Sequence, residues 1–252
     1  MARVLVPVPD HDFDTTEVSV PWRLLTDAGH EVVFATEGGG SAPACDPLLL
    51  TGVVFGQLGA EAEPKAFYAD MITTAAFRNP VAWSGLASSS FDALLLPGGH
   101  APGMKQYLAS EGLHALVADL WVRQVPVAAI CHGVLVLARA RTNDGASVLA
   151  AASTTCLPKY MERAAYFSTF WKVGRYYRTY PAYVEDEVKA ALRDPSSQFR
   201  RGPRVLRAKG TRTDDSDTFV VEDGRYVSAR WPGDAYAFAR AFLAKLPPGA
   251  RG

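Results

Sequence analysis

The sequence predicts an α/β fold, a three-layer sandwich whose central sheet is mostly parallel. Three short apolar runs, at 3–8, 93–96 and 125–130, have the continuity of strands that are buried on both faces. The stretches between them are long enough for the right-handed crossovers that parallel strands need. Two of the runs end in glycine turns, PGG after residue 96 and CHG after residue 130. Because ligands bind at such carboxyl ends of parallel strands, we expect the functional site there.

The first strand is followed by a predicted helix and a second strand. The helix begins in the segment DTTEVSVPW, where Asp14 or Thr15 is a candidate N-cap. Pro21 is expected to break or kink its first part, and Gly29 to end it. Residues 31–36, EVVFAT, then form the second strand.

Residues 37–90 are less regular and are predicted to be an insertion on the sheet rather than a second domain. They contain the glycine run 38–40 and a helix expected around 64–78. A further helix is predicted over 111–122, between the two strand runs that end in glycine turns. Another helix is expected to begin at the CHG turn itself, in the segment GVLVLARA.

The C-terminal half carries a second predicted insertion, at 157–215, which is aromatic-rich and helical in character. A hairpin is predicted at Asp223-Gly224, because this dipeptide lies between two β-rich runs. The last helix is predicted over 234–246, and residues 247–252 are expected to form a flexible tail. The sequence therefore predicts one domain over 1–246.

The composition excludes several classes of function. The chain has 252 residues with 26 basic and 26 acidic side chains, so it lacks the basic excess of proteins that bind nucleic acid. It has no apolar run of the about 18 residues that a membrane span needs, and its N-terminus does not follow the pattern of a secretory signal. Its three cysteines form no CxxC pair, which favours a reducing cytoplasm. The sequence contains no phosphate-binding loop, dinucleotide motif or metal-ligand spacing, so we expect no cofactor and no metal.

The strongest chemical signal is the pentapeptide AICHG at 129–133, where a β-run meets a helix. Such an elbow places its nucleophile in strained backbone geometry and exposes the side chain, here the thiol of Cys131. The helix dipole would favour the thiolate. Free cysteines are also among the most buried residue types, so Cys131 is equally typical of a structural core residue. The pentapeptide alone leaves both interpretations open.

Several segments together resemble the ThiJ/PfpI superfamily, a branch of the class I glutamine amidotransferase-like fold, which is flavodoxin-like. They are TEVSVPWRLLTDAGHEVVFAT, LLLPGGH and AICHG, and the resemblance is clear over about 1–150. The closing DGRYVSARWPGDAYAFARAFLAKL also resembles the hairpin and helix that end the family fold. The order PGGH, then CHG, looks most like the branch that holds glutathione-independent glyoxalases and holding chaperones.

The resemblance implies a set of catalytic residues around Cys131. A glutamate after the first strand lies beside the thiol in that family, and Glu17 matches it. Its carboxyl would be protonated and would donate a hydrogen bond to sulfur, although a first-turn glutamate also simply favours the helix dipole. His132 follows the cysteine as in the family. Glu162 matches an acidic residue about thirty positions further on and would orient the imidazole; otherwise it is a solvated helix residue beside Arg163.

The resemblance also implies that the PGG turn completes the site. Gly99 and the backbone after Gly98 would supply amide donors to a developing oxyanion, with the amide of His132 as the second donor. His100 would line the pocket or be merely solvated. Residues 166–183, YFSTFWKVGRYYRTYPAY, depart from the family pattern. They would roof the pocket, pack in the core or form a dimer contact.

Three functional hypotheses follow. The chain lacks the late His-x-Glu pair of true glutamine amidotransferases, since its last histidine is His132. The first hypothesis is a cofactor-free, cysteine-dependent enzyme on small carbonyl compounds, a glutathione-independent glyoxalase that converts 2-oxoaldehydes into 2-hydroxy acids. The second is a ThiJ/PfpI-type hydratase or hydrolase of a specialised metabolite. The third is non-enzymatic, a holding chaperone or an oxidation sensor based on Cys131. Relatives are often dimers, so a homodimer is expected.

Overall fold

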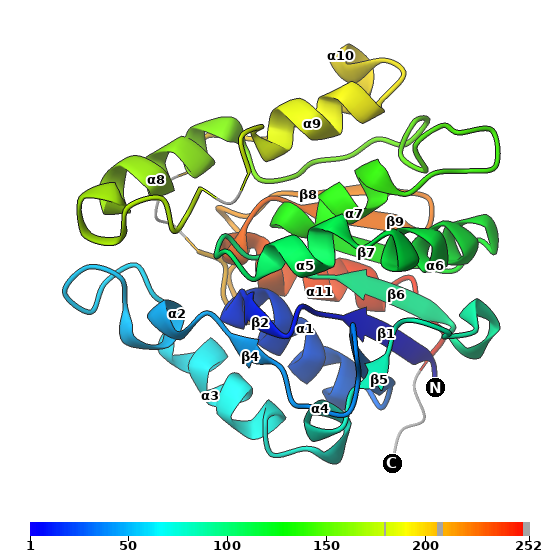
Figure 1. The fold of residues 1–252 in the computed structure, drawn as a ribbon, viewed down its shortest axis with the longest axis horizontal. Helices are drawn as coiled ribbons and strands as arrows, with labels where there is room; N and C mark the ends of the chain where they lie inside the picture. Colours follow the sequence, from blue (N-terminus) through cyan, green and yellow to red (C-terminus); the bar gives the residue numbers. More distant parts are fainter. Residues whose placement is uncertain (179, 206–208, 249–252) are drawn as a thin grey trace.

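The computed structural model describes residues 1–178, 180–205 and 209–248. Its main sheet has seven strands in the order β5-β3-β1-β6-β7-β9-β8, and every neighbouring pair is parallel except β8 with β9. This confirms the predicted α/β class with a mostly parallel central sheet (Figure 1). The strands of the main sheet are β1 (Arg3–Pro7), β3 (Glu31–Thr36), β5 (Val81–Ala82), β6 (Ala93–Leu96), β7 (Val127–Ile130), β8 (Val220–Asp223) and β9 (Tyr226–Ala229).

Helices cover both faces of this sheet (Figure 1). On one face α1 (Thr15–Asp27) packs against α11 (Ala235–Leu243), and α3 lies outside against α1. On the other face α6 (Glu111–Val122) packs against α7 (Val134–Arg139), and α9 lies outside α7. Within the described residues no helix has the length and apolarity to cross a membrane. The remaining helices are α2 (Pro47–Thr51), α3 (Ala62–Met71), α4 (Ala75–Arg78), α5 (Met104–Ala109), α8 (Lys159–Val173), α9 (Val184–Ala191) and α10 (Pro195–Gln198), with 3-10 turns η1 (Ser88–Ser90), η2 (Cys131–Gly133) and η3 (Pro232–Asp234).

Helix α1 carries Glu17 to the carboxyl end of the sheet, and its start and end agree with the predicted signals. The N-cap is Asp14, whose Oδ1 accepts hydrogen bonds from the backbone amides of Thr16 and Glu17 at 2.8 and 3.0 Å. The predicted break at Pro21 does not occur, because the helix continues through it. An interior proline costs about 3 kcal/mol or more, but residues 15–22 are all buried, and this packing outweighs the cost.

The hairpin predicted at Asp223-Gly224 joins β8 to β9 in antiparallel register, so β8 is an antiparallel edge strand on an otherwise parallel sheet. Gly224 has a φ of 58°, the left-handed conformation that a tight hairpin turn needs. Strand β9 pairs in parallel with β7, so the hairpin lies directly beside the strand that leads to Cys131.

The two predicted insertions surround this sheet. Residues 37–90 supply the short edge strand β5 and β4 (Ala44–Cys45), which pairs with β2 (His11–Phe13) in a separate two-stranded sheet. The single helix predicted around 64–78 is two helices, α3 and α4, because Thr74 starts a new helix by capping the amide of Phe77. The second insertion contains α8, α9 and α10 (Figure 1). Of the predicted tail 247–252, residues 249–252 lie outside the described part of the chain.

A buried ion pair holds the turn after β9, and its loss should destabilise the fold strongly. Arg230 and Asp234 are both 0% exposed and are joined by two contacts of 2.9 Å, Nε to Oδ2 and Nη2 to Oδ1. We expect Asp234→Ala to lower the free energy of unfolding in urea by about 3–5 kcal/mol, because it leaves a buried guanidinium without its counter-ion. As a control, Glu31→Ala removes an exposed pair with Arg3 and should cost under about 1 kcal/mol. Equal effects from the two variants would contradict this assignment.

Candidate active site at the carboxyl ends of strands β6 and β7

Cys131 occupies the sharp turn between β7 and α7, as the AICHG motif predicts. It has a φ of 58°, in the left-handed region that non-glycine residues rarely adopt. It is the first residue of the 3-10 turn η2, which leads directly into α7. A strained backbone at the end of a parallel strand is typical of functional residues. The side chain is nevertheless only 1% exposed, so the elbow does not present the thiol to open solvent in this conformation.

Two glycines allow the neighbouring strands to approach closely at this turn. A Cβ on Gly133 would lie 2.2 Å from the carbonyl oxygen of Leu96, at the end of β6. A Cβ on Gly98 would lie 2.7 Å from the His132 amide nitrogen, 2.8 Å from Glu17 Oε2 and 3.0 Å from Cys131 Cβ. Both positions therefore require glycine, and the Gly98 contacts show that Glu17, Cys131 and His132 surround one point in space.

Glu17 lies at this point, as the resemblance implied. It is 0% exposed, and its Oε2 accepts a hydrogen bond of 2.8 Å from the amide of Gly98. Its other oxygen, Oε1, is buried and has no hydrogen-bond partner among the described residues. Burial raises the pKa of Glu17 well above its ordinary value, and the neighbouring Asp14 raises it further. The raised pKa favours the protonated form of this carboxyl, which has an oxygen available to donate or accept a proton.

The pKa of the Cys131 thiol shifts in the direction opposite to the one that the helix dipole was expected to give. Burial raises its pKa well above the ordinary value, and the nearby Glu17 carboxyl adds to this rise. The amide of His132 donates toward the sulfur and opposes the shift. Burial prevails over the dipole because α7 has only six residues and the 3-10 turn separates it from the sulfur. The resting pair is thus a thiol beside a protonated carboxyl.

Two imidazoles, those of His132 and His100, lie near the sulfur. The Nδ1 atom of His132 lies 3.5 Å from Cys131 Sγ, so these adjacent residues do face each other. The His132 side chain is buried, and burial lowers its pKa well below the ordinary value. The ring of His100 meets that of His132 edge-to-face, with centroids 4.7 Å apart, and burial lowers the pKa of His100 to about 4. Both imidazoles are therefore neutral at physiological pH.

Glu162 is buried but is engaged away from His132. Its Oε1 pairs with Arg178 Nη1 at 2.5 Å, and its Oε2 accepts a hydrogen bond of 3.0 Å from the amide of Val184. The structure shows no hydrogen bond between Glu162 and His132, both of which it describes. The expectation that Glu162 orients the imidazole directly is therefore not met. The carboxylate is used instead to tie α8 to the start of α9 and to the segment that carries Arg178.

The predicted oxyanion donors are only partly free. The amide of Gly98 is committed to Glu17, so it does not point at an oxyanion position in this conformation. Its carbonyl oxygen accepts a hydrogen bond from the amide of Asp14, which fixes the turn against the start of α1. The amides of Gly99 and His132 stay the predicted donors.

The aromatic segment 166–183 divides between roof and surface. The Tyr177 ring meets that of His100 at 6.0 Å, and its hydroxyl donates a hydrogen bond of 2.9 Å to Asp46 Oδ2. Tyr176 donates to the other oxygen of Asp46, at 3.1 Å. This part of the segment therefore packs over the site, as a roof would. The α8 part instead leaves an exposed aromatic patch, made of Phe167, Phe170 and Trp171 together with Phe55.

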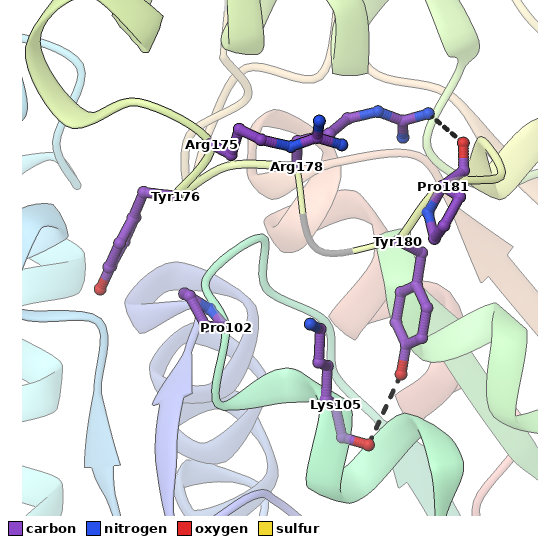
Figure 2. A pocket seen from close by; sticks show the side chains of 7 residues that line it. All are labelled: Pro102, Lys105, Arg175, Tyr176, Arg178, Tyr180 and Pro181. Atoms are coloured by element: carbon purple, nitrogen blue, oxygen red, sulfur yellow. Dashed lines mark hydrogen bonds between the residues drawn. The ribbon is translucent and has the colours of Figure 1, made fainter.

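A cavity of about 290 Å³ lies between the loop after His100 and the segment 175–181 (Figure 2). Cys131 is not among its lining residues, and three of the lining side chains are cationic. Figure 2 shows that Tyr180 spans it toward the Lys105 carbonyl and that Arg178 reaches Pro181. The lining residues are Pro102, Lys105, Arg175, Tyr176, Arg178, Tyr180 and Pro181.

Sequence reasoning missed Asp46, which anchors the roof. It is buried, it caps α2 through Leu48, and it accepts both tyrosine hydroxyls. The Asp-Pro step at 46–47 is a recognisable helix start, but that signal does not indicate its second role. The pairing spans about a hundred and thirty residues of sequence, so only the tertiary structure reveals it.

Known proteins are similar to this chain along most of its length. The chain matches the family model described as ThiJ/PfpI family-like over residues 8–203. It is 30% identical over 247 residues to an uncharacterised protein of Schizosaccharomyces pombe, covering 95% of this chain and 82% of that one. It is 26% identical to a deglycase of Pyrococcus abyssi, covering 97% and 99%.

Solved structures show the same fold at lower identity. Glyoxalase III of Candida albicans superimposes with a TM-score of 0.67 at 19% identity, covering 98% of both chains. The Rapid Encystment Protein of Francisella tularensis gives a TM-score of 0.70, also at 19% identity, covering 97% of this chain and 99% of that one. These likenesses concern the arrangement of helices and strands.

Proposed function

Since this chain belongs to the ThiJ/PfpI-like family, we propose that it is a cysteine-dependent enzyme on small reactive carbonyl compounds, and specifically a glutathione-independent glyoxalase. One observation carries the proposal. A buried thiol at a strained elbow lies between a protonated carboxyl, Glu17, and a neutral imidazole, His132. That set contains a nucleophile and two groups able to move protons, which is all that a 2-oxoaldehyde needs to become a 2-hydroxy acid.

In the first step the Cys131 sulfur adds to the aldehyde carbon of the substrate. A carbon–sulfur bond forms, the thiol proton passes to His132 Nδ1, which lies 3.5 Å away, and the aldehyde oxygen receives a proton to give a hemithioacetal. Glu17 transfers its proton to that oxygen and becomes a carboxylate, while the amides of Gly99 and His132 donate hydrogen bonds to the oxygen. Because the pKa of the thiol is raised, the sulfur adds to the aldehyde while its proton is being transferred, and no thiolate forms beforehand.

In the second step a proton moves from the former aldehyde carbon to the neighbouring carbon through an enediol. The Oε1 atom of the Glu17 carboxylate, buried and without a hydrogen-bond partner among the described residues, takes the carbon proton and returns it to the neighbouring carbon. His132, protonated in the first step, gives its proton to the ketone oxygen and then takes the proton of the former aldehyde hydroxyl, which it returns to sulfur when the thioester is cleaved. The product is a thioester on Cys131. Water then cleaves the carbon–sulfur bond, which restores the thiol and releases the 2-hydroxy acid. The net reaction therefore needs no cofactor.

The proposal is tested by incubating the protein with methylglyoxal in the absence of glutathione. We expect lactate to accumulate catalytically, with many equivalents per protein, and a covalent adduct on the chain to be visible by mass spectrometry at early times. Because Cys131 supplies the thiol that forms the adduct, added glutathione should not be required. Failure to form lactate above the rate without protein would reject glyoxalase activity.

A second candidate is a hydrolase of the deglycase type, favoured by the relatives that bear that name, among them the protein of Pyrococcus abyssi. The same thiol would then act on a carbonyl adduct of an amine, and water would complete the hydrolysis. The two candidates differ in a direct measurement. A deglycase would release the free amine from a pre-formed glycated amine faster than the adduct dissociates spontaneously. A glyoxalase would act only on the aldehyde after this spontaneous dissociation, so the amine would appear no faster than the adduct dissociates.

A further inference from the structure

We propose that His100, Cys131 and His132 form a binding site for a thiophilic divalent ion of the zinc type, which would block the nucleophile reversibly. One ligand atom from each residue can be chosen so that all three lie within 4.8 Å of one another. The inference does not depend on carbonyl chemistry, because it concerns the resting side chains alone.

The donor set selects the class of ion. One sulfur and two imidazole nitrogens are the ligands that zinc and related borderline ions prefer, whereas magnesium and calcium require oxygen ligands. Three protein ligands leave a fourth tetrahedral position open for water, as in zinc sites that exchange their ligands. The site thus differs in kind from a closed structural zinc site.

The spacing suits such an ion with one small adjustment. Zinc–sulfur and zinc–nitrogen bonds of about 2.3 and 2.0–2.1 Å place tetrahedral sulfur and nitrogen ligands about 3.6 Å apart. The distance from Cys131 Sγ to His132 Nδ1 is 3.5 Å, so these two ligands are already in place. All three ligand atoms lie within 4.8 Å of one another, so a shift of His100 by at most about an ångström brings the third ligand to this spacing.

The fold holds these ligands together before any ion arrives. Cys131 and His132 are successive residues of the strained turn η2, and both are almost fully buried. His100 comes from the loop after β6, the strand that pairs with β7, so sheet pairing itself brings the third ligand in. Its ring lies between those of His132 and Tyr177, at 4.7 and 6.0 Å.

Binding exchanges one proton for the ion. The S–H bond of Cys131 breaks, the metal–sulfur bond forms, and the proton leaves to the buffer, while the two imidazoles donate lone pairs without losing a proton. The metal–sulfur bond withdraws electron density from the sulfur and occupies the space beside it, which lowers its reactivity toward an electrophile. The excess positive charge of the bound ion would lie close to the Glu17 carboxyl, which interacts with the same thiol.

The test uses the reduced full-length protein and Co²⁺ as a spectroscopic probe for zinc. We expect one equivalent of Co²⁺ to give a thiolate-to-cobalt band in the near ultraviolet with intense tetrahedral bands in the visible, release of one proton, and displacement by Zn²⁺. His100→Ala should weaken Co²⁺ binding by about tenfold or more. The control variant His11→Ala removes an exposed histidine and should bind as the wild type does.

A measurement on the unaltered protein keeps the proposal open to refutation if His100→Ala fails to fold. Zinc X-ray absorption of the one-to-one complex should show one sulfur and at least two imidazole nitrogens in the first shell. A shell without sulfur, or equal Co²⁺ affinity in wild type and folded His100→Ala, would overturn the site. None of these readouts uses turnover, so the absence of glyoxalase activity would leave the inference standing.

Discussion

Replacement of Cys131 by alanine should lower the glutathione-free conversion of methylglyoxal to lactate by roughly a thousandfold or more, to the rate without protein. The variant keeps the carboxyl of Glu17 and the imidazole of His132 but has no atom to form the carbon–sulfur bond. Both proton carriers act on an adduct that then never exists. The measurement is the initial rate of lactate formation at fixed protein concentration, compared with wild type.

The fold should survive this change, which makes the loss of activity interpretable. Alanine at position 131 keeps the Cβ and the φ of 58°, so it neither relieves nor adds backbone strain, and the small cavity left by sulfur costs about 1–2 kcal/mol. Cys156→Ala is the matched control, since it removes another fully buried thiol, far along the chain from the elbow. Equal rates from Cys131→Ala and wild type would refute the thiol mechanism, whatever the behaviour of the control.

Glu17→Gln should reduce the same turnover by about a hundredfold or more while leaving the protein folded. A glutamine oxygen can still accept the hydrogen bond from the Gly98 amide, so the turn at 98 keeps its anchor. Its amide group, however, cannot take up and return a proton between the two substrate carbons. Glu111→Gln, at an exposed glutamate in the first turn of α6, is the control and should be fully active. A fully active Glu17→Gln enzyme would show that another group carries the proton.

The same variant has a readout in stability against pH. Burial raises the pKa of Glu17 in the folded protein well above the ordinary value of a glutamate. As pH rises above that value, the unfolded chain releases this proton while the folded chain keeps it, so wild-type stability falls through this window. Glu17→Gln lacks this titrating group. The free energy of unfolding of the variant should therefore increase relative to that of wild type as pH rises above the ordinary glutamate pKa, by at most about 1.4 kcal/mol per pH unit. A stability difference between the two proteins that stays the same at all pH values would mean that the pKa of Glu17 is not raised by folding.

The prediction of the helix and strand positions succeeded where local signals were strong. The runs 31–36 and 93–96 are strands with those bounds, and 111–122 is a helix with those bounds. The signals failed where burial decided the outcome. Pro21 was expected from local rules to break or kink the helix, yet α1 continues through it because its first half is wholly buried. The roof formed by Tyr176 and Tyr177 on Asp46 had no local signal, since the partners are far apart in the chain.

By itself the sequence determined the α/β class, the elbow at Cys131 and the identity of Glu17 as its neighbour, because strand periodicity, glycine turns and the family motifs are local patterns. Only the tertiary structure decided the chemical state of the site. Burial on every side keeps the thiol and the carboxyl protonated and the imidazoles neutral, against the helix dipole that local reasoning invoked. The tertiary structure also decided that Glu162 contacts Arg178 and Val184 rather than His132. Desolvation and long-range pairing depend on which distant segments cover a side chain, and a one-dimensional pattern does not contain that information.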